Sequence, residues 1–318
     1  MKLKSLKILI VGLVIALVSL PAFTSTAKVS FYVSSPGVVS AIPLFLIQEE
    51  NLLGEDIDFK VHISPDHQRA LSLLSKNEIQ AVVTGVNVGA LAFNRGIGIK
   101  LLNVNIWAVD YLLTYGFRAV KWDDLKGKSL SLPLKGGPLD FVVRYILEKT
   151  GTGIEEINIV YIPLPQGANY FQAGKIDAIV LPEPLVTVIL KKVPQAILSM
   201  DIQEEWAKFH GGDKRIPFVG LFVSSKFTEE YPDIVERFAQ AYFQKAKWIW
   251  ENKEDASRLA EKYLNIPAPV FKEALTRTHF ECVFSQEAKE IVESYLEEIL
   301  EMYPELIGGK LPDEEFYY

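Results

Sequence analysis

Two loops combine residue types that bind polar or anionic groups. Ser34, Ser35 and Pro36 follow a short β-rich run and precede a helical stretch, so hydroxyl groups meet free backbone N–H groups at a helix start. Residues 136–140 (Gly-Gly-Pro-Leu-Asp) repeat this arrangement, with Pro138 suited to the first helical position. Helix starts of this kind favour anionic or polar ligand groups. A simple cap and turn is the alternative interpretation of each loop.

A third loop presents a carboxylate in a stiff setting. Glu183 lies between Pro182 and Pro184 at the end of a predicted strand, and a residue that precedes a proline is held extended. Such a carboxylate either accepts hydrogen bonds from an amine or amidine-like edge of a ligand, or caps the helix that follows. The sequence leaves both interpretations open.

The motifs of the common catalytic and metal sites are absent from the sequence. It contains no Walker A loop, no dinucleotide-binding glycine pattern, no zinc-protease motif and no nucleophile elbow. His62 and His67 are spaced unsuitably for a standard metal pair, and we interpret Cys282, the single cysteine, as a buried small apolar residue. We therefore expect no catalytic residue, no metal site and no cofactor, which favours a binding protein over an enzyme.

Two series of alternating strands and helices position these loops. This order predicts parallel sheets covered by helices. From residue 231 onward the pattern is almost entirely helical. The first series has strands at 28–34, 59–64 and 80–84 and helices at 38–53, 66–77 and 87–95. The second has strands at 129–133, 157–162, 176–181 and 196–199 and helices at 138–149, 168–174 and 185–192.

An internal similarity links the two series. Residues 77–83 (NEIQAVV) resemble residues 174–180 (GKIDAIV), and each segment places a polar turn between a helix end and a buried strand. This indicates two α/β lobes of related build, against the alternative of chance similarity between two apolar strands. Residues 101–115 and 216–224 are extended and apolar, so we expect them to cross between the lobes. Because ligands bind beyond the carboxyl ends of strands in open α/β sheets, one cleft between the lobes is predicted.

Composition and the first residues set the class and compartment. The chain has 318 residues, 49% of them hydrophobic, and a formal charge of −7, which argues against nucleic acid and anionic membranes as partners. Three lysines precede an apolar run at 8–20, and Ser25-Thr26-Ala27 matches a cleavage site. We expect a signal peptide at 1–27 and export to the periplasm, with an uncleaved anchor as the alternative. No cysteine follows the apolar run, which closes the lipoprotein route.

The order of these segments resembles the nitrate, sulfonate, taurine and thiamine-pyrimidine family of substrate-binding proteins of ABC transporters. The matching pieces cover nearly all of the chain after residue 27. They are residues 122–130 (WDDLKGKSL), 136–140 (GGPLD), 174–178 (GKIDA) leading to Glu183-Pro184, and 309–318 (GKLPDEEFYY). Gln80 departs from the family pattern, which repeats an Asp there as Asp177 does, and we interpret that position as structural.

The resemblance implies an α/β type II periplasmic-binding fold of two lobes, with two crossing hinge strands and a helical C-terminal region. Lobe 1 would comprise residues 28–115 and 217–318, and lobe 2 residues 116–216. Ligand would close the lobes, and the closed form, a monomer, would dock on the permease subunits. The implied ligand-binding residues are Ser34, Ser35, Thr84, Gly85, Asn87, Trp107 or Asn105, Gly136, Gly137, Asp140, Gln166 and Glu183.

The residue types at these loops favour one ligand class. Arginine and lysine are missing from the Ser34, Thr84 and Glu183 loops, whereas Trp107, Tyr111 and Glu183 offer aromatic faces and a carboxylate. These suit a flat, amine-bearing heterocycle, such as a pyrimidine precursor of thiamine. A sulfonate, taurine or nitrate is the alternative, since backbone N–H groups alone hold anions. A second alternative is a cytosolic enzyme of the same fold that acts on a thiamine-pyrimidine or menaquinone precursor.

Overall fold

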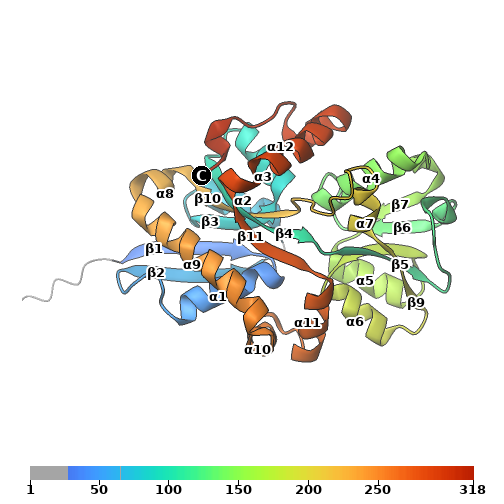
Figure 1. Cartoon of the computed structure of the whole chain (residues 1–318), viewed down its shortest axis with the longest axis horizontal. Coiled ribbons are helices and arrows are strands. Elements are labelled where there is room, and N and C mark those ends of the chain that lie inside the picture. The colour runs from blue at the N-terminus through green and yellow to red at the C-terminus, as the bar shows by residue number, and fades with distance from the viewer. Residues whose placement is uncertain (1–27, 65) are drawn as a thin grey trace, which may run out of the picture.

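Two β-sheets, each covered by helices, form the two lobes of the protein (Figure 1). The structure is a computed structural model that describes residues 28–64 and 66–318. The predicted signal peptide, residues 1–27, lies outside the described residues. We call the part built on the six-stranded sheet lobe 1 and the part built on the five-stranded sheet lobe 2. The predicted two-lobe fold is confirmed.

Lobe 1 contains a six-stranded sheet in the order β11-β4-β10-β3-β1-β2. Its strands are β1 (Val29–Ser35), β2 (Ile57–Ile63), β3 (Ala81–Gly85), β4 (Ile99–Ala108), β10 (Val219–Ser224) and β11 (His279–Phe284). Its helices are α1 (Ile42–Glu49), α2 (His67–Ser75), α3 (Val86–Asn94), α8 (Ser225–Glu230), α9 (Pro232–Glu251), α10 (Lys253–Leu264), α11 (Ala268–Ala274) and α12 (Ser285–Met302).

Lobe 2 contains a five-stranded sheet in the order β7-β6-β8-β5-β9. Its strands are β5 (Asp110–Tyr115), β6 (Ser129–Leu132), β7 (Asn158–Tyr161), β8 (Ala178–Pro182) and β9 (Ala196–Asp201). Its helices are α4 (Pro138–Thr150), α5 (Leu164–Gln172), α6 (Leu185–Lys192) and α7 (Ile202–Ala207).

Both sheets are mixed: the alternating series form the predicted parallel pairs, and strands from the crossing segments add antiparallel ones. β1 is parallel to β2 and β3, and β6 is parallel to β7 and β8, as the alternating pattern predicts. However, β10 is antiparallel to β3 and β4, and β5 is antiparallel to β8 and β9. β5 and β10 are the strands with which the chain enters each sheet from the other lobe. They therefore run opposite to the strands that the β-α-β units supply.

The strand β11 corrects one expectation. Residues 279–284 lie in the region predicted to be helical, yet they form the edge strand of the lobe 1 sheet and pair with β4. Phe280 and Cys282 are buried while Glu281 is exposed, which is the alternation of a half-buried strand. Cys282 is thus the buried small residue that the sequence predicts. Two short helices, α7 and α8, were also not predicted.

Most other predicted elements are present with shifted ends. α6 has the predicted bounds, and the Asp66 side chain caps α2 by accepting a hydrogen bond from the Arg69 N–H at 2.9 Å. α1 ends at Glu49, four residues before the predicted end, and α5 begins at Leu164, four residues before the predicted start. Pro165 lies in the first turn of α5, where a proline is tolerated because no helical partner exists for its missing N–H.

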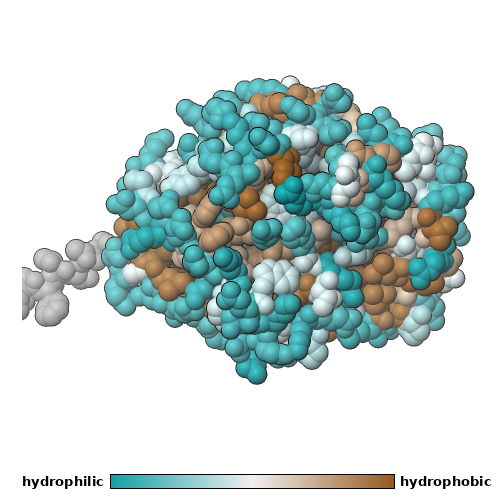
Figure 2. All heavy atoms as spheres, in the orientation of Figure 1, coloured by the Kyte–Doolittle hydropathy of each residue, from teal (hydrophilic) through white to brown (hydrophobic). Residues whose placement is uncertain are grey.

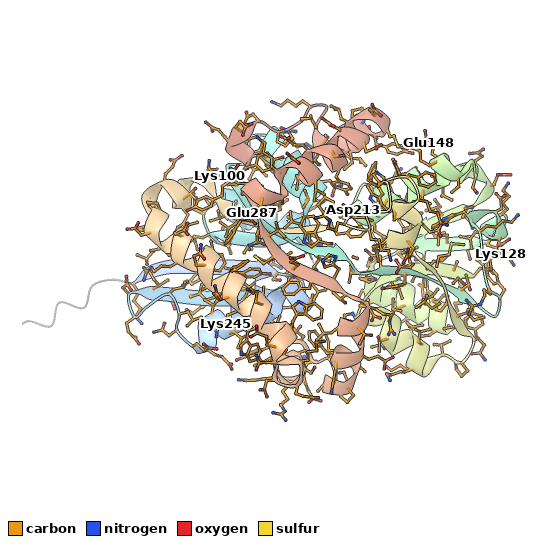
Figure 3. The ribbon with its side chains drawn as sticks, in the orientation of Figure 1. Lys100, Lys128, Glu148, Asp213, Lys245 and Glu287 are labelled. Carbon is orange, nitrogen blue, oxygen red and sulfur yellow. The ribbon has the colours of Figure 1, made fainter. Side chains whose placement is uncertain are left out.

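The surface is predominantly polar. The face shown in Figure 2 is mostly hydrophilic with small, separate apolar areas. Charged side chains such as Glu148 on α4 and Glu287 on α12 lie on the outside of the two lobes (Figure 3). Among residues 28–64 and 66–318, no helix has both the length and the apolar character that crossing a membrane requires.

Candidate functional site

Two chain segments cross side by side between the lobes. β4 of lobe 1 continues into β5 of lobe 2 with only Val109 between them. The second segment leads from α7 back to β10. Its Ile216 N–H donates to the Trp107 carbonyl at 2.9 Å, and its Phe218 N–H donates to the Ile106 carbonyl at 3.1 Å. These paired crossings are the two predicted hinge strands, and the candidate site lies where the neighbouring loops meet.

Lobe 1 contributes the carboxyl ends of β1 and β3. Ser34 and Ser35 end β1 and are buried, and the Ser35 hydroxyl donates to the Pro36 carbonyl at 3.0 Å. Thr84 is fully buried, and its hydroxyl lies 2.9 Å from Nδ1 of His67. Burial lowers the pKa of His67. Thr84 is therefore already bonded to a side chain of its own lobe.

Lobe 2 contributes the loop before α4, which Asp140 shapes. Its carboxylate accepts hydrogen bonds at 2.8 Å from the Gly136 N–H, from Nε of Arg144 and from the Tyr161 hydroxyl. Gly136 has φ 77, in the left-handed region that glycine adopts without strain. The Asp140 side chain thus holds the loop in place, and its predicted contact with a ligand stays a prediction.

The two lobes touch directly at these loops. Nδ2 of Asn87, in the first turn of α3, donates to the Gly136 carbonyl across the lobe boundary at 3.1 Å. A Cβ atom on Gly85 would lie 2.7 Å from Cγ of Pro138, shorter than ordinary van der Waals contact. The structure therefore brings Gly85, Asn87, Gly136 and Gly137 together, and the protein is in a closed arrangement.

An aromatic cluster also joins the two lobes, through side chains of α4, α7 and α12. The Phe141 ring of α4 lies 5.5 Å from the Tyr295 ring of α12, in an edge-to-face arrangement. The Trp206 ring of α7 lies 6.1 Å from Tyr295. All three side chains are buried, so apolar contact between the lobes stabilises this closed arrangement.

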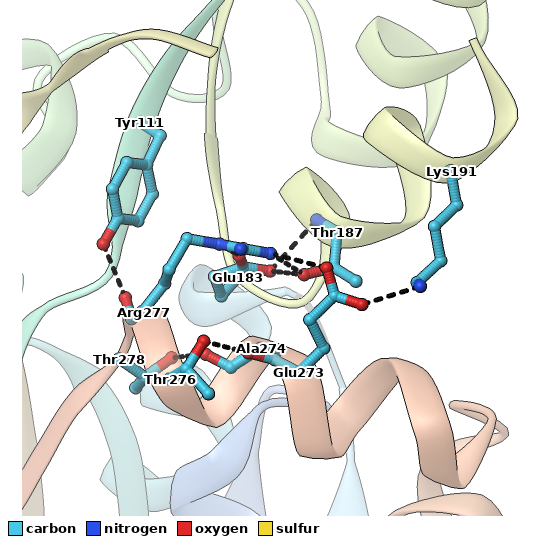
Figure 4. Close-up of polar contacts among 9 residues, drawn as sticks. All are labelled: Tyr111, Glu183, Thr187, Lys191, Glu273, Ala274, Thr276, Arg277 and Thr278. Carbon is cyan, nitrogen blue, oxygen red and sulfur yellow. Dashed lines mark hydrogen bonds and ion pairs between the residues drawn. The ribbon is translucent and has the colours of Figure 1, made fainter. Parts of the chain in front are cut away.

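Glu183 has partners within the chain. One oxygen accepts hydrogen bonds from the Thr187 N–H at 3.1 Å and from its hydroxyl at 2.8 Å, so Glu183 caps the start of α6. The other oxygen accepts from Nε of Arg277 at 2.5 Å (Figure 4). Of the two interpretations the sequence allowed, the structure shows the cap. The place beside the carboxylate that a ligand amine would take is held by Arg277.

Trp107 and Gln166 do not join the other predicted contacts. The Trp107 indole is buried in the core, and its N–H donates to the Glu281 carbonyl of β11 at 2.9 Å. The Trp107 ring therefore faces the core and not the loops between the lobes, because β11 covers it and accepts the hydrogen bond from its N–H. Gln166 is exposed on α5 and donates to the Tyr170 hydroxyl of the same helix at 3.2 Å.

Several buried amide groups near the crossing strands have unused hydrogen-bonding atoms. Asn105 Nδ2 donates to Asn103 Oδ1 at 3.0 Å, and both side chains are fully buried. Among the described residues, nothing hydrogen bonds to Oδ1 of Asn87, Oδ1 of Asn105 or Nδ2 of Asn103. Since buried polar atoms are nearly always paired, these three atoms are available to a polar ligand.

Asp110 and Arg277 are the notable residues that sequence reasoning missed. Asp110 begins β5 beside Pro182, is buried, and receives no hydrogen bond on its carboxylate from the part of the chain described. Burial, together with the nearby Asp201 carboxylate, raises the pKa of Asp110 to about 7. An acidic residue in an otherwise apolar strand was the available signal for Asp110. Arg277 gave none, because its partner Glu183 lies 94 positions away.

No cluster of three or more His, Cys, Asp or Glu side chains suited to a metal ion occurs within residues 28–64 and 66–318. Burial also raises the pKa of the Cys282 thiol far above its ordinary value, so the thiolate that would bind a metal or attack a substrate is disfavoured.

Both the sequence and the structure are similar to those of known proteins. Residues 116–264 match the NMT1-like family. No curated protein sequence matches the chain. The structure is similar to that of an ABC transporter protein from Parabacteroides distasonis, with a TM-score of 0.75, 21% identity, and coverage of 92% of this chain and 99% of the other.

Two further solved structures share the fold. The alkanesulfonate-binding protein SsuA from Xanthomonas axonopodis pv. citri, bound to MOPS, has a TM-score of 0.70 and 16% identity, covering 91% of this chain and 96% of its own. The ligand-binding component of an ABC-type import system from Staphylococcus aureus has a TM-score of 0.75 and 8% identity, covering 92% and 97%. The fold is that of the periplasmic binding proteins, as predicted.

Proposed function

We propose that the protein is the exported solute-binding component of an ABC importer, which captures a small molecule between its lobes and delivers it to permease subunits. The observation that carries this proposal is the hydrogen bond from Asn87 to Gly136, which joins the loops of both lobes beside two crossing strands. Proteins with this fold from Xanthomonas and Staphylococcus are named as binding components, which supports the proposal. Because β5 (Asp110–Tyr115) pairs with strands of lobe 2, the lobe boundary that we propose lies at Val109 instead of after residue 115, and the second crossing stays near residue 216.

The ligand we propose is a flat, amine-bearing heterocycle such as an aminopyrimidine. The support differs from that offered by the sequence, because Glu183 is paired with Arg277 and Trp107 is packed in the core. It rests instead on the unpaired buried oxygens of Asn87 and Asn105, which accept hydrogen bonds from ligand amino groups. Ser34, Ser35 and Gly137 would complete the contacts.

A sulfonate is the second candidate, and two observations favour it. The SsuA proteins from Xanthomonas axonopodis and Escherichia coli, which share the fold, are named as sulfonate-binding proteins. Neither α3 nor α4 has a capping side chain on its N-cap residue, so each helix start still offers N–H groups to an anion, although the Val86 N–H of α3 already donates to the Phe218 carbonyl at 3.2 Å and Pro138 at the start of α4 has no N–H. Arg277 contributes little here, since Glu183 already neutralises its charge.

A thermal-shift panel of aminopyrimidines, thiamine, taurine, alkanesulfonates and nitrate tests the proposal. Ligand at 100 times its dissociation constant adds about 2.7 kcal/mol of stability, which raises the melting temperature by several degrees. We expect a shift with aminopyrimidines and none with nitrate. A shift with sulfonates alone would replace the heterocycle by the second candidate. Mass spectrometry of the bound ligand after incubation, expected to show it unchanged, tests the competing enzyme class.

A further inference from the structure

An ion-pair network joins the lobes on the side of α6 and α11 (Figure 4). Arg277 ends a short helical turn, Leu275–Arg277, two residues before β11, and so belongs to lobe 1. Glu183 directly follows β8 of lobe 2, and its N–H donates to the Val109 carbonyl at 2.9 Å. The bond between Nε of Arg277 and Oε1 of Glu183 therefore spans the lobe boundary close to the hinge.

Burial makes this pair strongly dependent on its geometry. The Glu183 side chain is 1% exposed and the Arg277 side chain 25%. A buried ion whose partner is removed is costly, because nothing replaces the lost solvation. Separation of the lobes would take Arg277 away from a Glu183 carboxylate that is almost fully buried. The pair therefore resists opening more than a surface ion pair does.

Two more contacts extend the network to either side of this pair. The Tyr111 hydroxyl of β5 donates to the Arg277 carbonyl at 2.8 Å, nearest the hinge. Nζ of Lys191, near the far end of α6, lies 2.6 Å from Oε2 of Glu273 on α11. That outer pair is exposed and individually weak, but it lies farther from the crossing strands and separates more when the lobes open.

We propose that Tyr111, Glu183, Lys191, Glu273 and Arg277 form an interlobe latch that stabilises the closed arrangement of the two lobes. Ligand entry then requires the latch to break, and the protein regains it on closing. The latch consists of contacts within the chain and needs no ligand, so it goes beyond the proposed transport function.

The distance between the lobes in the ligand-free protein tests the latch. Spin labels are attached through Lys76→Cys in lobe 1 and Glu148→Cys in lobe 2, in a Cys282→Ala background, and pulsed electron resonance gives the distance distribution. We expect one narrow distribution for the parent protein and a broader one, extending to longer distances, for Arg277→Gln. A broad distance distribution in the parent protein would overturn the proposal. So would an Arg277→Gln distribution identical to that of the parent.

Arg258→Gln is the matched control. Arg258 pairs with Asp255 at 2.7 Å, and both lie on α10 of lobe 1, so the substitution removes an arginine ion pair without touching the lobe boundary. We expect the parent distribution for this variant; an equal broadening would overturn the latch, because loss of any arginine pair would then produce it.

A second variant covers the case in which Arg277→Gln does not fold. Lys191→Gln removes only the outer, exposed pair, and we expect a smaller change in the same direction. If Lys191→Gln leaves the distance distribution unchanged, the proposal is overturned. Since no ligand is needed, these distances decide the proposal even if the thermal-shift panel finds no ligand.

Discussion

Two carboxylates at the same strand junction differ in their partners. Glu183 and Asp110 are neighbours, because the Glu183 N–H bonds to Val109 and Asp110 pairs with Pro182 across β5 and β8. Both are buried. Glu183 has an arginine and a threonine, whereas none of the described residues donates to the Asp110 carboxylate. Residue type alone therefore does not decide charge; the neighbours do.

The buried carboxyl of Asp110 predicts an unusual pH dependence of stability. Burial and Asp201 raise its folded-state pKa to about 7, so the folded protein holds a proton that the unfolded chain has lost. The proton-linked stabilisation is complete below about pH 4 and is lost as pH rises towards 7 and above. A pKa difference of this size corresponds to about 4 kcal/mol as an upper limit.

Asp110→Asn, which mimics the protonated side chain, removes this dependence. We expect the free energy of unfolding of the variant, relative to the parent, to improve by about 2–3 kcal/mol between pH 5 and pH 8. Urea denaturation at both pH values measures it. Asp255→Asn, an exposed change on α10, serves as the control. Parallel pH profiles for Asp110→Asn and the parent would contradict the assignment.

At the scale of elements, the repeated segments perform the same task in each lobe. The Gln80 side chain, just before β3, accepts a hydrogen bond from the Tyr32 N–H of β1 at 2.7 Å. Asp177, just before β8, accepts from the N–H and the hydroxyl of Ser129 of β6 at 2.9 and 2.8 Å. Each ties a central strand to its parallel neighbour. Gln80 therefore makes the kind of strand-to-strand contact that Asp177 makes, as expected of a structural position.

The charge at position 177 makes the two copies respond differently to substitution. Hydrogen bonds to a charged group contribute about 1.5–3 kcal/mol and neutral ones about 1 kcal/mol. We expect Asp177→Ala to destabilise the protein by about 3 kcal/mol and Gln80→Ala by about 1 kcal/mol, measured by urea denaturation at pH 7. Equal losses would show that the charge of Asp177 adds nothing.

Acid separates the two variants further. The hydrogen bonds from Ser129 lower the pKa of Asp177, so its contribution is complete above about pH 4 and is lost as pH falls through the lowered value. The difference in stability between parent and Asp177→Ala should therefore shrink on acidification below pH 4. That between parent and Gln80→Ala should not change.

At the scale of the whole molecule, closure depends on a glycine at the lobe boundary. Gly85 ends β3 with φ −61, a backbone conformation that alanine adopts without strain. A methyl group there would meet Pro138 of the opposite lobe at 2.7 Å. Gly85→Ala therefore leaves each lobe intact but prevents full closure.

We expect Gly85→Ala to increase the radius of gyration in small-angle scattering and to lower the affinity for any ligand held between the lobes by at least tenfold. Gly98→Ala is the matched control, because its methyl group would lie 3.6 Å from Ser225 of the same lobe, an ordinary contact. An unchanged radius and affinity for Gly85→Ala would show that the loops around Pro138 yield without moving the lobes.

Local sequence patterns determined much of this molecule. The two α/β series, the Asp66 cap, the bounds of α6 and the crossing segments at 101–115 follow from hydrophobic periodicity, capping residues and prolines. These signals depend on neighbours within a few residues. They also located the loops at Gly85, Asn87 and Gly136 that the structure brings together, since strand ends and helix starts are local features.

Only the tertiary structure decided the contacts that depend on distant partners. β11 became a strand because β4 offered an open edge, and Trp107 was buried because β11 covered it. Glu183 was paired because the fold carried Arg277 back to the hinge, and Asp110 was buried beside Asp201 with no hydrogen-bond donor among the residues that the structure describes. Burial and ion pairing are set by residues far away in the sequence, so periodicity and composition contain no record of them.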